Sequence, residues 1–357
     1  MPLLPTEIND LHELTYDTVL SQRSWNDLSD DKNFYTIVDR FFRGKKVNIK
    51  SGTQVSWKLQ IANQNTAKWT ALYDEDSYEV KNLATTGLQA WAMCTASMTY
   101  DVREPDFQSD DKFMLVDAIL MREHSMYTDW FKLLETAFWT APTAAASGAA
   151  PQQLCGIPFW LQKSATLGHY GANPSGFSSG AGNVDADTYR QWRNGTGSYR
   201  TVGRDDFITK LRTMTEFCRF RPAHNYPQSS GAASAADPMY TYYTTFDIWE
   251  QCCKYLDARQ ENVRDLSGTS GDPMYKSIPI SWVPELTDAA ADGYDSTNPF
   301  YGVNWGAIKL YFLQGREMLR SGPRVRDDSH NMVAVNLDST LQLTADDRRS
   351  SFVLYQA

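Results

Sequence analysis

Two stretches of the chain alternate between apolar and polar residues, with the period of two that is typical of half-buried β-strands. The second stretch runs over residues 88–102, and the apolar positions of the first are Val47, Ile49, Val55, Trp57, Leu59 and Ile61. A mostly polar connection of about 25 residues joins the two stretches, which is unusually long inside a compact domain. Trp69 and Tyr73 stand among its polar residues, where we expect them to be exposed. The pattern predicts an outstretched two-stranded loop.

A single long helix is predicted after this loop. Ser109 offers an N-cap, and apolar residues then recur at three- or four-residue spacing. The stripe consists of Phe113, Val116, Leu120, Tyr127, Phe131, Leu134 and Phe138. At about 1.5 Å per residue, a helix over residues 110–139 is about 45 Å long. Pro142 prevents its continuation.

Residues 1–45 mix acidic and amide side chains with isolated apolar residues, among them Trp25, Phe34 and Phe41. This composition predicts an extended arm with one helical piece at residues 34–42, whose aromatic side chains need a partner surface. An ordinary N-terminal helix packed on its own domain fits the same composition equally well.

The rest of the chain mixes helices and strands without a βαβ rhythm or an internal repeat. Residues 151–230 are rich in Gly, Ser, Asn and aromatic residues, with one helix at 207–218. Further along, the pattern predicts strands at 240–244, 275–283, 307–313, 333–343 and 352–355, and a helix at 246–259. We therefore expect an α+β fold.

Composition narrows the classes of protein that fit. The chain has 357 residues, of which 42% are apolar and 13% aromatic, so it can bury a substantial core. Its mean hydropathy of -0.49 shows that polar residues are abundant as well. We therefore expect much of the aromatic content to lie beside polar groups, as it does in protein interfaces. A net charge of -9 and a pI of about 5.1 argue against tight binding to nucleic acid.

The sequence offers no recognisable catalytic, cofactor-binding or metal-binding motif. The five cysteines have no C-x-x-C spacing, and Asp185 and Asp187 lack the closing Glu of a calcium loop. A P-loop, a dinucleotide-binding glycine motif, a nucleophile elbow and an H-E-x-x-H zinc motif are all missing. The first residues do not form a signal peptide, and no stretch is apolar enough to span a membrane. We expect a protein of the reducing cytoplasm without cofactors, metals or membrane contact.

The order of the predicted elements resembles the HK97-type fold of major capsid proteins of tailed, podovirus-like bacteriophages. Local sequences carry the resemblance: Cys-Gly-Ile-Pro-Phe-Trp-Leu at 155–161, Asn-Pro-Ser-Gly-Phe at 173–177, Tyr-Arg-Gln-Trp-Arg-Asn at 189–194, Pro-Ile-Ser-Trp-Val-Pro at 279–284, Tyr-Gly-Val-Asn-Trp at 301–305 and Arg-Arg-Ser-Ser-Phe-Val-Leu-Tyr at 348–355.

This resemblance implies a division of the chain. Residues 1–45 would be an N-terminal arm, 46–103 an E-loop hairpin, and 104–150 with 321–357 a peripheral (P) domain around a spine helix at 109–139. Residues 151–320 would form a mixed α/β axial (A) domain, which the C-terminal strands partly join.

The resemblance also implies the function. Hexamers and pentamers of the chain would close an icosahedral shell around double-stranded DNA, which it would contact non-specifically. Assembly in the bacterial host cytoplasm would use a separate scaffolding protein and a portal, with a decoration protein as a further partner of the virion. The residues expected at contacts between subunits, through the arm and the E-loop, are Trp25, Phe34, Phe41, Lys58, Lys68, Trp69 and Tyr73.

Two other readings stay open at this point. One is an encapsulin-like shell that holds protein cargo, and the other is a cytoplasmic α+β enzyme with an unrecognised site. The best-known capsid protein of this type crosslinks an E-loop lysine to an asparagine of a neighbour. Lys58, Lys68 and Lys81 lie in or near the loop, but no motif identifies the asparagine, so we expect no crosslinking. Deleting residues 62–87 is expected to spare folding and block assembly.

Overall fold

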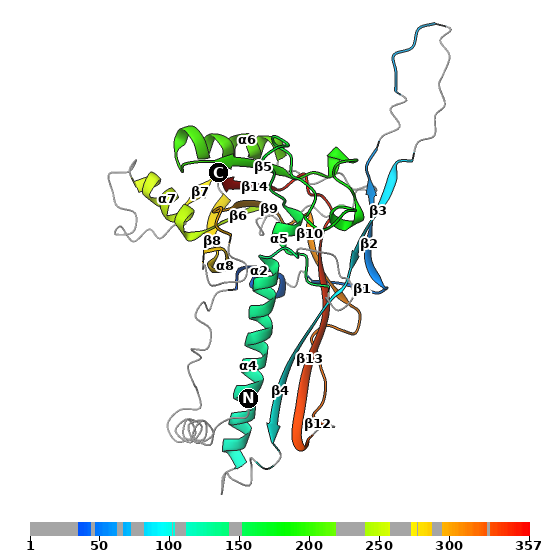
Figure 1. Cartoon of the computed structure of the whole chain (residues 1–357), viewed down its shortest axis with the longest axis vertical. Coiled ribbons are helices and arrows are strands. Elements are labelled where there is room, and N and C mark those ends of the chain that lie inside the picture. The colour runs from blue at the N-terminus through cyan, green and yellow to red at the C-terminus, as the bar shows by residue number, and fades with distance from the viewer. Residues whose placement is uncertain are drawn as a thin grey trace.

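The structure, a computed structural model, describes residues 35–43, 47–62, 67–72, 82–101, 103, 112–142, 152–218, 240–257, 273–276, 278–287, 295–326 and 329–357. The molecule is elongated (Figure 1). A long helix and two long strands run down one part of the body, a broader lobe lies at one end, and a thin hairpin projects beyond that lobe.

The long part of the body is built on a sheet around strand β13 (Ser329–Ala345). Strand β4 (Ala92–Asp101) pairs antiparallel with one edge of β13, from Met332 opposite Asp101 to Leu341 opposite Ala92. The other edge pairs in turn with β12 (Arg324–Arg326), β11 (Leu319–Arg320) and β10 (Ile308–Leu313), and β1 (Val47–Lys50) adds a parallel strand to β10.

The predicted long helix is helix α4 (Lys112–Phe138), which packs along β4. Its buried face repeats every fourth residue at Met126, Trp130, Leu134 and Phe138. The predicted stripe is correct at Leu134 and Phe138 but wrong at Leu120, which is 47% exposed. Residue spacing predicts which side chains share a face, whereas burial depends on what lies beside each turn of the helix.

Gly156 lets a later segment of the chain pass close to the end of α4. A Cβ at Gly156 would lie 2.3 Å from the carbonyl oxygen of Thr140 and 2.5 Å from that of Phe138. Only a residue without a side chain lets the following segment pass this close to the last turn of the helix. Helix α5 (Ile157–Trp160) then begins directly after this crossing.

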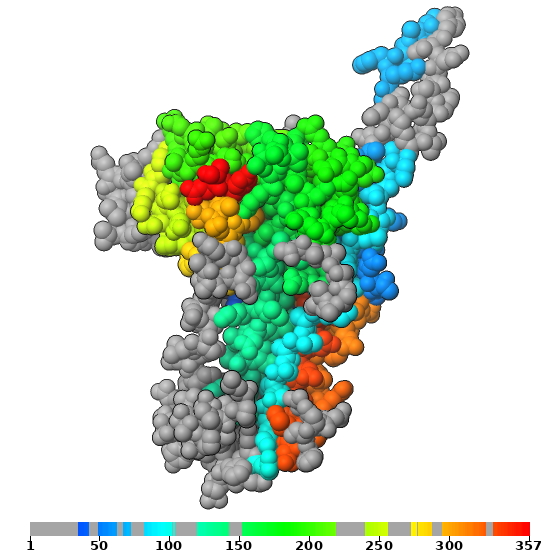
Figure 2. All heavy atoms as spheres, in the orientation of Figure 1, coloured from blue at the N-terminus to red at the C-terminus, as the bar shows by residue number. Residues whose placement is uncertain are grey.

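The lobe contains a second six-stranded sheet in the order β5-β14-β9-β6-β8-β7. The strands are β5 (Gly195–Tyr199), β6 (Tyr240–Thr244), β7 (Met274–Tyr275), β8 (Ile278–Trp282), β9 (Phe300–Asn304) and β14 (Phe352–Gln356). In Figure 2 the C-terminal residues, drawn in red, lie among the green and orange residues of this lobe. The last two strands of the chain therefore join different sheets, β13 the first and β14 the second.

Helices surround this second sheet. They are α6 (Thr209–Cys218), which follows a π-helical turn η3 (Arg204–Ile208), together with α7 (Phe246–Asp257), α8 (Pro284–Thr287) and the short turns η1 (Ala181–Asn183) and η2 (Arg190–Trp192). The helix predicted at 207–218 is confirmed as the end of η3 followed by α6, and its buried face runs from Phe207 to Cys218. Its residues pack with Tyr242, Phe300 and Phe352 in a core of the lobe.

Two predictions for strands need correction. The alternating run at residues 88–102 is not one strand of the hairpin, because it is interrupted at Trp91 and its second half, β4, pairs with β13. The run predicted at 275–283 is split into β7 and β8, which pair antiparallel with each other. Alternation alone does not reveal such interruptions, since both halves keep the same period.

Candidate functional site

The projecting hairpin consists of strands β2 (Gln54–Gln60) and β3 (Ala84–Ala90). They pair antiparallel from Gln54 opposite Ala90 to Gln60 opposite Ala84, and together they form a separate two-stranded sheet. In Figures 1 and 2 the hairpin leaves the body beside the lobe and its far end stands clear of every other element. Its predicted two-stranded form is confirmed.

The described residues at the far end of the hairpin, 67–72, are all exposed. Trp69 is fully exposed, and Leu72 is 84% exposed. Large apolar side chains held this far from the body cannot contribute to its core. Exposed apolar groups of this kind mark contact sites for other molecules, and tryptophan is among the residues that contribute most to such contacts.

The root of the hairpin is tied to the first sheet by side-chain hydrogen bonds. The indole N–H of Trp91 donates to the carbonyl oxygen of Gly52 (2.9 Å), which joins the two chain segments that enter the hairpin. The side-chain amide of Gln342 in β13 donates to the carbonyl oxygen of Ala90 (2.8 Å), and its oxygen accepts from the backbone N–H of Cys155 (2.9 Å). The starting point of the hairpin is therefore fixed on the body.

The helical piece predicted in the N-terminal arm is helix α2 (Thr36–Arg43), and it packs on its own subunit. Phe41 is 2% exposed, and its ring lies 5.8 Å from that of Phe138 and 5.5 Å from that of Trp305. Phe41 is thus used within the subunit, and we no longer assign it to contacts between subunits. For this piece, the alternative of a helix packed on its own domain is the correct one.

A buried carboxylate holds this helix in place. Glu135 in α4 is 1% exposed and accepts hydrogen bonds from the backbone N–H groups of Ile37 (3.1 Å) and Val38 (3.0 Å) and from the indole N–H of Trp139 (2.9 Å). Burial raises the pKa of Glu135, while these three donors act in the opposite direction. Nothing in the sequence pattern pointed to Glu135, since its partners in α2 are almost a hundred residues away.

The other residues expected at contacts between subunits do not converge on one site. Lys58 lies exposed on the shaft of the hairpin, and Lys68 lies exposed beside Trp69 at its far end. Trp25, Phe34 and Tyr73 lie outside the described residues. The described members of the set on the hairpin, Lys58, Lys68 and Trp69, therefore share one projecting element.

The lobe is held together by buried polar groups that the sequence analysis did not single out. Arg348 is 1% exposed, and its Nε donates to the carbonyl oxygen of Trp160 (2.7 Å) and its Nη2 to Oδ1 of Asn194 (3.2 Å). Burial lowers the pKa of Arg348 to about 9. This guanidinium ties the segment between β13 and β14 to the end of helix α5 and to the loop at Asn194.

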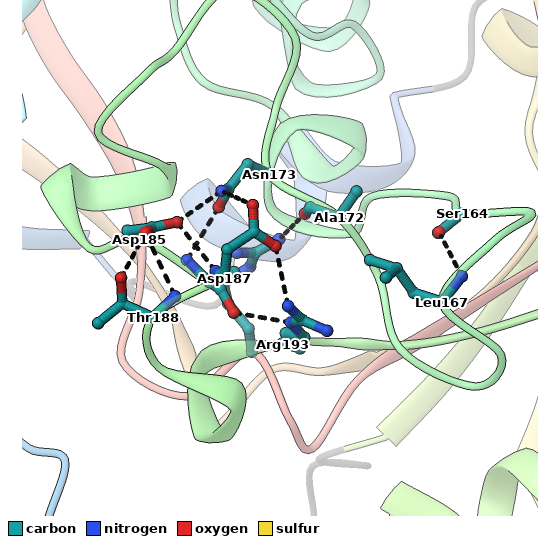
Figure 3. Close-up of polar contacts among 10 residues, drawn as sticks. Ser164, Leu167, Ala172, Asn173, Asp185, Asp187, Thr188 and Arg193 are labelled. Atoms are coloured by element: carbon teal, nitrogen blue, oxygen red, sulfur yellow. Dashed lines mark hydrogen bonds and ion pairs between the residues drawn. The ribbon is translucent and has the colours of Figure 1, made fainter.

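The acidic pair considered for a metal loop is engaged by neighbouring side chains (Figure 3). Asp185 accepts hydrogen bonds from Nδ2 of Asn173 (2.7 Å) and the hydroxyl of Thr188 (2.6 Å), and Asp187 forms an ion pair with Arg193 (2.8 Å). These donors, with Thr188 first, lower the pKa of Asp185 to about 2. Within the described ranges, no group of three or more His, Cys, Asp or Glu side chains could hold a metal ion.

Among the helices of the described residues, none combines the length and apolar character needed to cross a bilayer. The five cysteines are all described and are all free thiols.

Comparison with known proteins gave matches at the level of structure. No protein-family model and no curated protein matches the sequence. The structure is similar to the capsid protein of cyanophage A-1(L), with a TM-score of 0.61 at 12% identity over 96% of this chain and 98% of the other. The chain has the HK97-type capsid fold.

Two further solved structures share this HK97-type fold at similar coverage. The capsid of a native GTA particle aligns with a TM-score of 0.57 at 10% identity, over 95% of this chain and 98% of the other. The capsid of the Myoviridae phage XM1 aligns with a TM-score of 0.51 at 10% identity, again over 95% and 98%. The similarity therefore extends over nearly the whole chain, and the predicted fold is confirmed.

Proposed function

We propose that this chain is the major capsid protein of a tailed bacteriophage. Copies of it assemble as hexamers and pentamers into an icosahedral shell that encloses double-stranded DNA. The observation that carries this proposal is the hairpin, which holds Trp69 fully exposed at the far end of an HK97-type subunit. A second subunit is the partner that such a projection fits, because a shell is built from many copies of one chain and an exposed apolar end needs a surface that covers it.

The two sheets correspond to the two domains of this proposal. The sheet around β13, with α4 as the spine helix, is the P domain, and the sheet around β14 is the A domain. Hairpin β2–β3 with residues 61–83 is the E-loop. Strand pairing favours assigning β4 and β10 to the P domain, although the sequence analysis grouped them with the E-loop and the A domain.

The partners follow from the same proposal. The shell subunit acts with a separate scaffolding protein during assembly in the host cytoplasm, with a portal at one vertex, and with a decoration protein on the virion. Its contact with packaged DNA is non-specific and weak, which a net charge of -9 supports, since a strongly basic lining would hold the DNA as it enters. The subunit has a structural role and no catalytic one.

Expression of the chain with the scaffolding gene of its own genome tests the proposal. We expect size-exclusion chromatography to separate capsomers and megadalton particles, and negative-stain electron microscopy to show closed shells of uniform size. Single subunits under every assembly condition would contradict the proposal. Neighbouring genes for a terminase and a portal agree with a phage capsid, whereas a neighbouring gene for a cargo enzyme would instead indicate a nanocompartment.

A further inference from the structure

A second attachment, farther along the hairpin than its root, joins the hairpin to the A domain. Trp57 lies in the middle of β2, directly opposite Gly87 of β3. Its indole lies across that glycine, because a Cβ at Gly87 would be 2.4 Å from Cε2 of Trp57. Any other residue at position 87 would push the indole out of place.

The far edge of the same indole meets the A domain. A Cβ at Gly182, in the turn η1, would lie 3.0 Å from Cζ2 of Trp57, and the ring of Trp160 lies 6.1 Å away in an edge-to-face arrangement at 65°. The backbone at Gly182 also has a φ of 66°, a left-handed conformation that residues other than glycine rarely adopt. We call this site, formed by Gly87, Gly182 and Trp160, the Trp57 seat.

Neighbouring residues show where the attachment ends. Gln89, two positions beyond Gly87 toward the root, is buried, and its side-chain amide donates to the thiol sulfur of Cys155 (3.1 Å). Val55 is also completely buried, and Leu59 and Ile61, beyond Trp57 on the same side of the strand, are partly buried against the main core, whereas Lys58 and Gln60 on the opposite side are exposed. The hairpin therefore packs on the body from its root to Ile61 and projects from there.

Two attachments at different points along a ribbon define its direction. The hydrogen bonds of Trp91 and Gln342 fix the starting point of the hairpin, and the Trp57 seat fixes a second point farther along. A two-stranded ribbon without a third strand is at best marginally stable on its own, so contacts with the body hold it in place. The direction in which Trp69 is presented to a neighbour thus depends on the packing of Trp57, with Leu59 and Ile61 beside it.

The Trp57 seat holds the ring by shape and leaves one polar group unsatisfied. The indole nitrogen of Trp57 is buried and donates to no acceptor in the structure. An unsatisfied buried donor costs about 1–3 kcal/mol, which offsets part of the gain from burying the ring. The attachment is therefore weaker than the fit of the ring implies.

We propose that Trp57 is a positioning residue for shell assembly. Seated between Gly87 and Gly182, it fixes one direction of the E-loop; unseated, it lets the E-loop take a range of directions while both domains stay folded. This inference rests on the proposed function only where it concerns the shell. The direction of the hairpin is a property of the single subunit and is measured there.

Distances between spin labels at Ala84, on the hairpin, and Gln191, on the A domain, test the proposal in unassembled subunits. Labels attached through bioorthogonal amino acids leave the five cysteines in place. We expect one narrow distance distribution for the wild type, for Trp57→Phe, which keeps a ring without the unsatisfied N–H, and for the exposed control Lys58→Ala. We expect a distribution at least about twice as wide for Trp57→Ala, because side-chain packing at the seat is lost.

Gly182→Val is a second way to displace the indole of Trp57, and it leaves the hairpin sequence intact. The valine side chain would fill the Trp57 seat from the A domain. It should widen the distribution as Trp57→Ala does. Circular dichroism identifies any variant that fails to fold. If one of Trp57→Ala and Gly182→Val fails to fold, the distance distribution of the other tests the proposal. A narrow, wild-type distribution in a folded Trp57→Ala or Gly182→Val subunit would overturn the proposal.

Electron microscopy of assembled material tests the consequence for the shell. Trp57→Ala is expected to give particles of mixed size and open sheets, with Lys58→Ala giving uniform shells. Uniform shells from a Trp57→Ala chain with a widened distribution would overturn the positioning role in assembly. The wild type could form no particles although the distance distributions of wild type and variants differ as expected. In that case the proposed function is wrong, and the role of Trp57 in directing the hairpin of the single subunit still stands.

Discussion

The carboxylate of Glu135 accepts a hydrogen bond from the backbone N–H of Val38, a residue 97 positions earlier in the chain, at 3.0 Å. Val38 belongs to the first turn of helix α2, whose N–H groups have no partner within the helix. The same carboxylate also accepts from Ile37 and from the indole of Trp139. One buried side chain of the spine helix therefore caps the helix of the N-terminal arm.

Removing this cap should destabilise the subunit. Glu135→Ala leaves two backbone N–H groups and one indole N–H buried without an acceptor, so we expect the free energy of unfolding to fall by about 2–4 kcal/mol. Urea denaturation of unassembled subunits measures the change. Asp129→Ala, at an exposed position of the same helix, should change it by no more than about 0.5 kcal/mol. Equal effects of the two substitutions would show that the cap does not stabilise the fold.

The same carboxylate predicts a pH dependence. Because burial raises the pKa of Glu135 in the folded state, the folded chain binds more protons than the unfolded chain between the two pKa values. The preferential protonation of Glu135 in the folded state adds to the free energy of unfolding. This addition is complete below the unfolded pKa of about 4.3 and is lost as the pH rises through the folded pKa. Glu135→Gln cannot titrate, so the stability of the wild type relative to this variant should decrease with rising pH. Denaturation curves from pH 4 to 8 measure the difference in free energy of unfolding between the wild type and Glu135→Gln. An increase of this difference with pH would contradict the prediction.

Local patterns in the sequence predicted the elements well where packing agreed with them. The strand at Tyr240–Thr244 begins and ends where the sequence pattern places it, and the long helix and the first strand of the hairpin are where their periods predict them. The second strand of the hairpin is β3 and not the predicted run at 88–102. These elements are local, so their residue types and spacing contain the necessary information.

Contacts between distant parts of the chain could not be predicted in this way. The pairing of β4 with β13 joins residues more than 200 positions apart, and neither strand indicates its partner. Glu135 and Arg348 are charged residues that a sequence pattern assigns to the surface, yet both are buried by segments far away in the chain. Phe41 shows the same limit, because its spacing predicts a helix face and not the surface that the face contacts.

Arg348 should be essential for the A domain to fold. Arg348→Ala leaves the carbonyl oxygen of Trp160 and Oδ1 of Asn194 with one donor fewer and opens a cavity beside Trp192. We expect the free energy of unfolding to fall by at least about 3 kcal/mol. Arg348→Lys should restore only part of this loss, because an ammonium group lacks the planar fork that reaches both acceptors.

The neighbouring arginine provides a matched control. The side chain of Arg349 is 54% exposed, and Arg349→Ala should alter the free energy of unfolding by no more than about 0.5 kcal/mol. Thermal and urea denaturation monitored by near-ultraviolet circular dichroism report on the aromatic core of the lobe. Similar curves for the two alanine variants would refute the structural role of Arg348.

A substitution at the exposed end of the hairpin should affect assembly without affecting the folding of the subunit. Trp69 contacts no core, so Trp69→Ala should leave the unfolding curve of the single subunit unchanged. Burial of a tryptophan at a contact between subunits commonly contributes 2 kcal/mol or more, so assembly should require at least about tenfold higher protein concentration. Light scattering during assembly measures that concentration.

Two controls make the result at Trp69 specific. Thr70→Ala alters the adjacent exposed residue without removing an aromatic ring, and it should assemble at the concentration of the wild type. A short linker in place of residues 62–82 should preserve the pairing of β2 with β3, whereas the deletion of 62–87 would also remove Gly87 from beneath Trp57. If Trp69→Ala assembles like the wild type while the linker variant fails, another residue of the loop makes the contact. If Trp69→Ala unfolds the subunit, the exposed end is part of the fold, and its assignment to contacts between subunits is wrong.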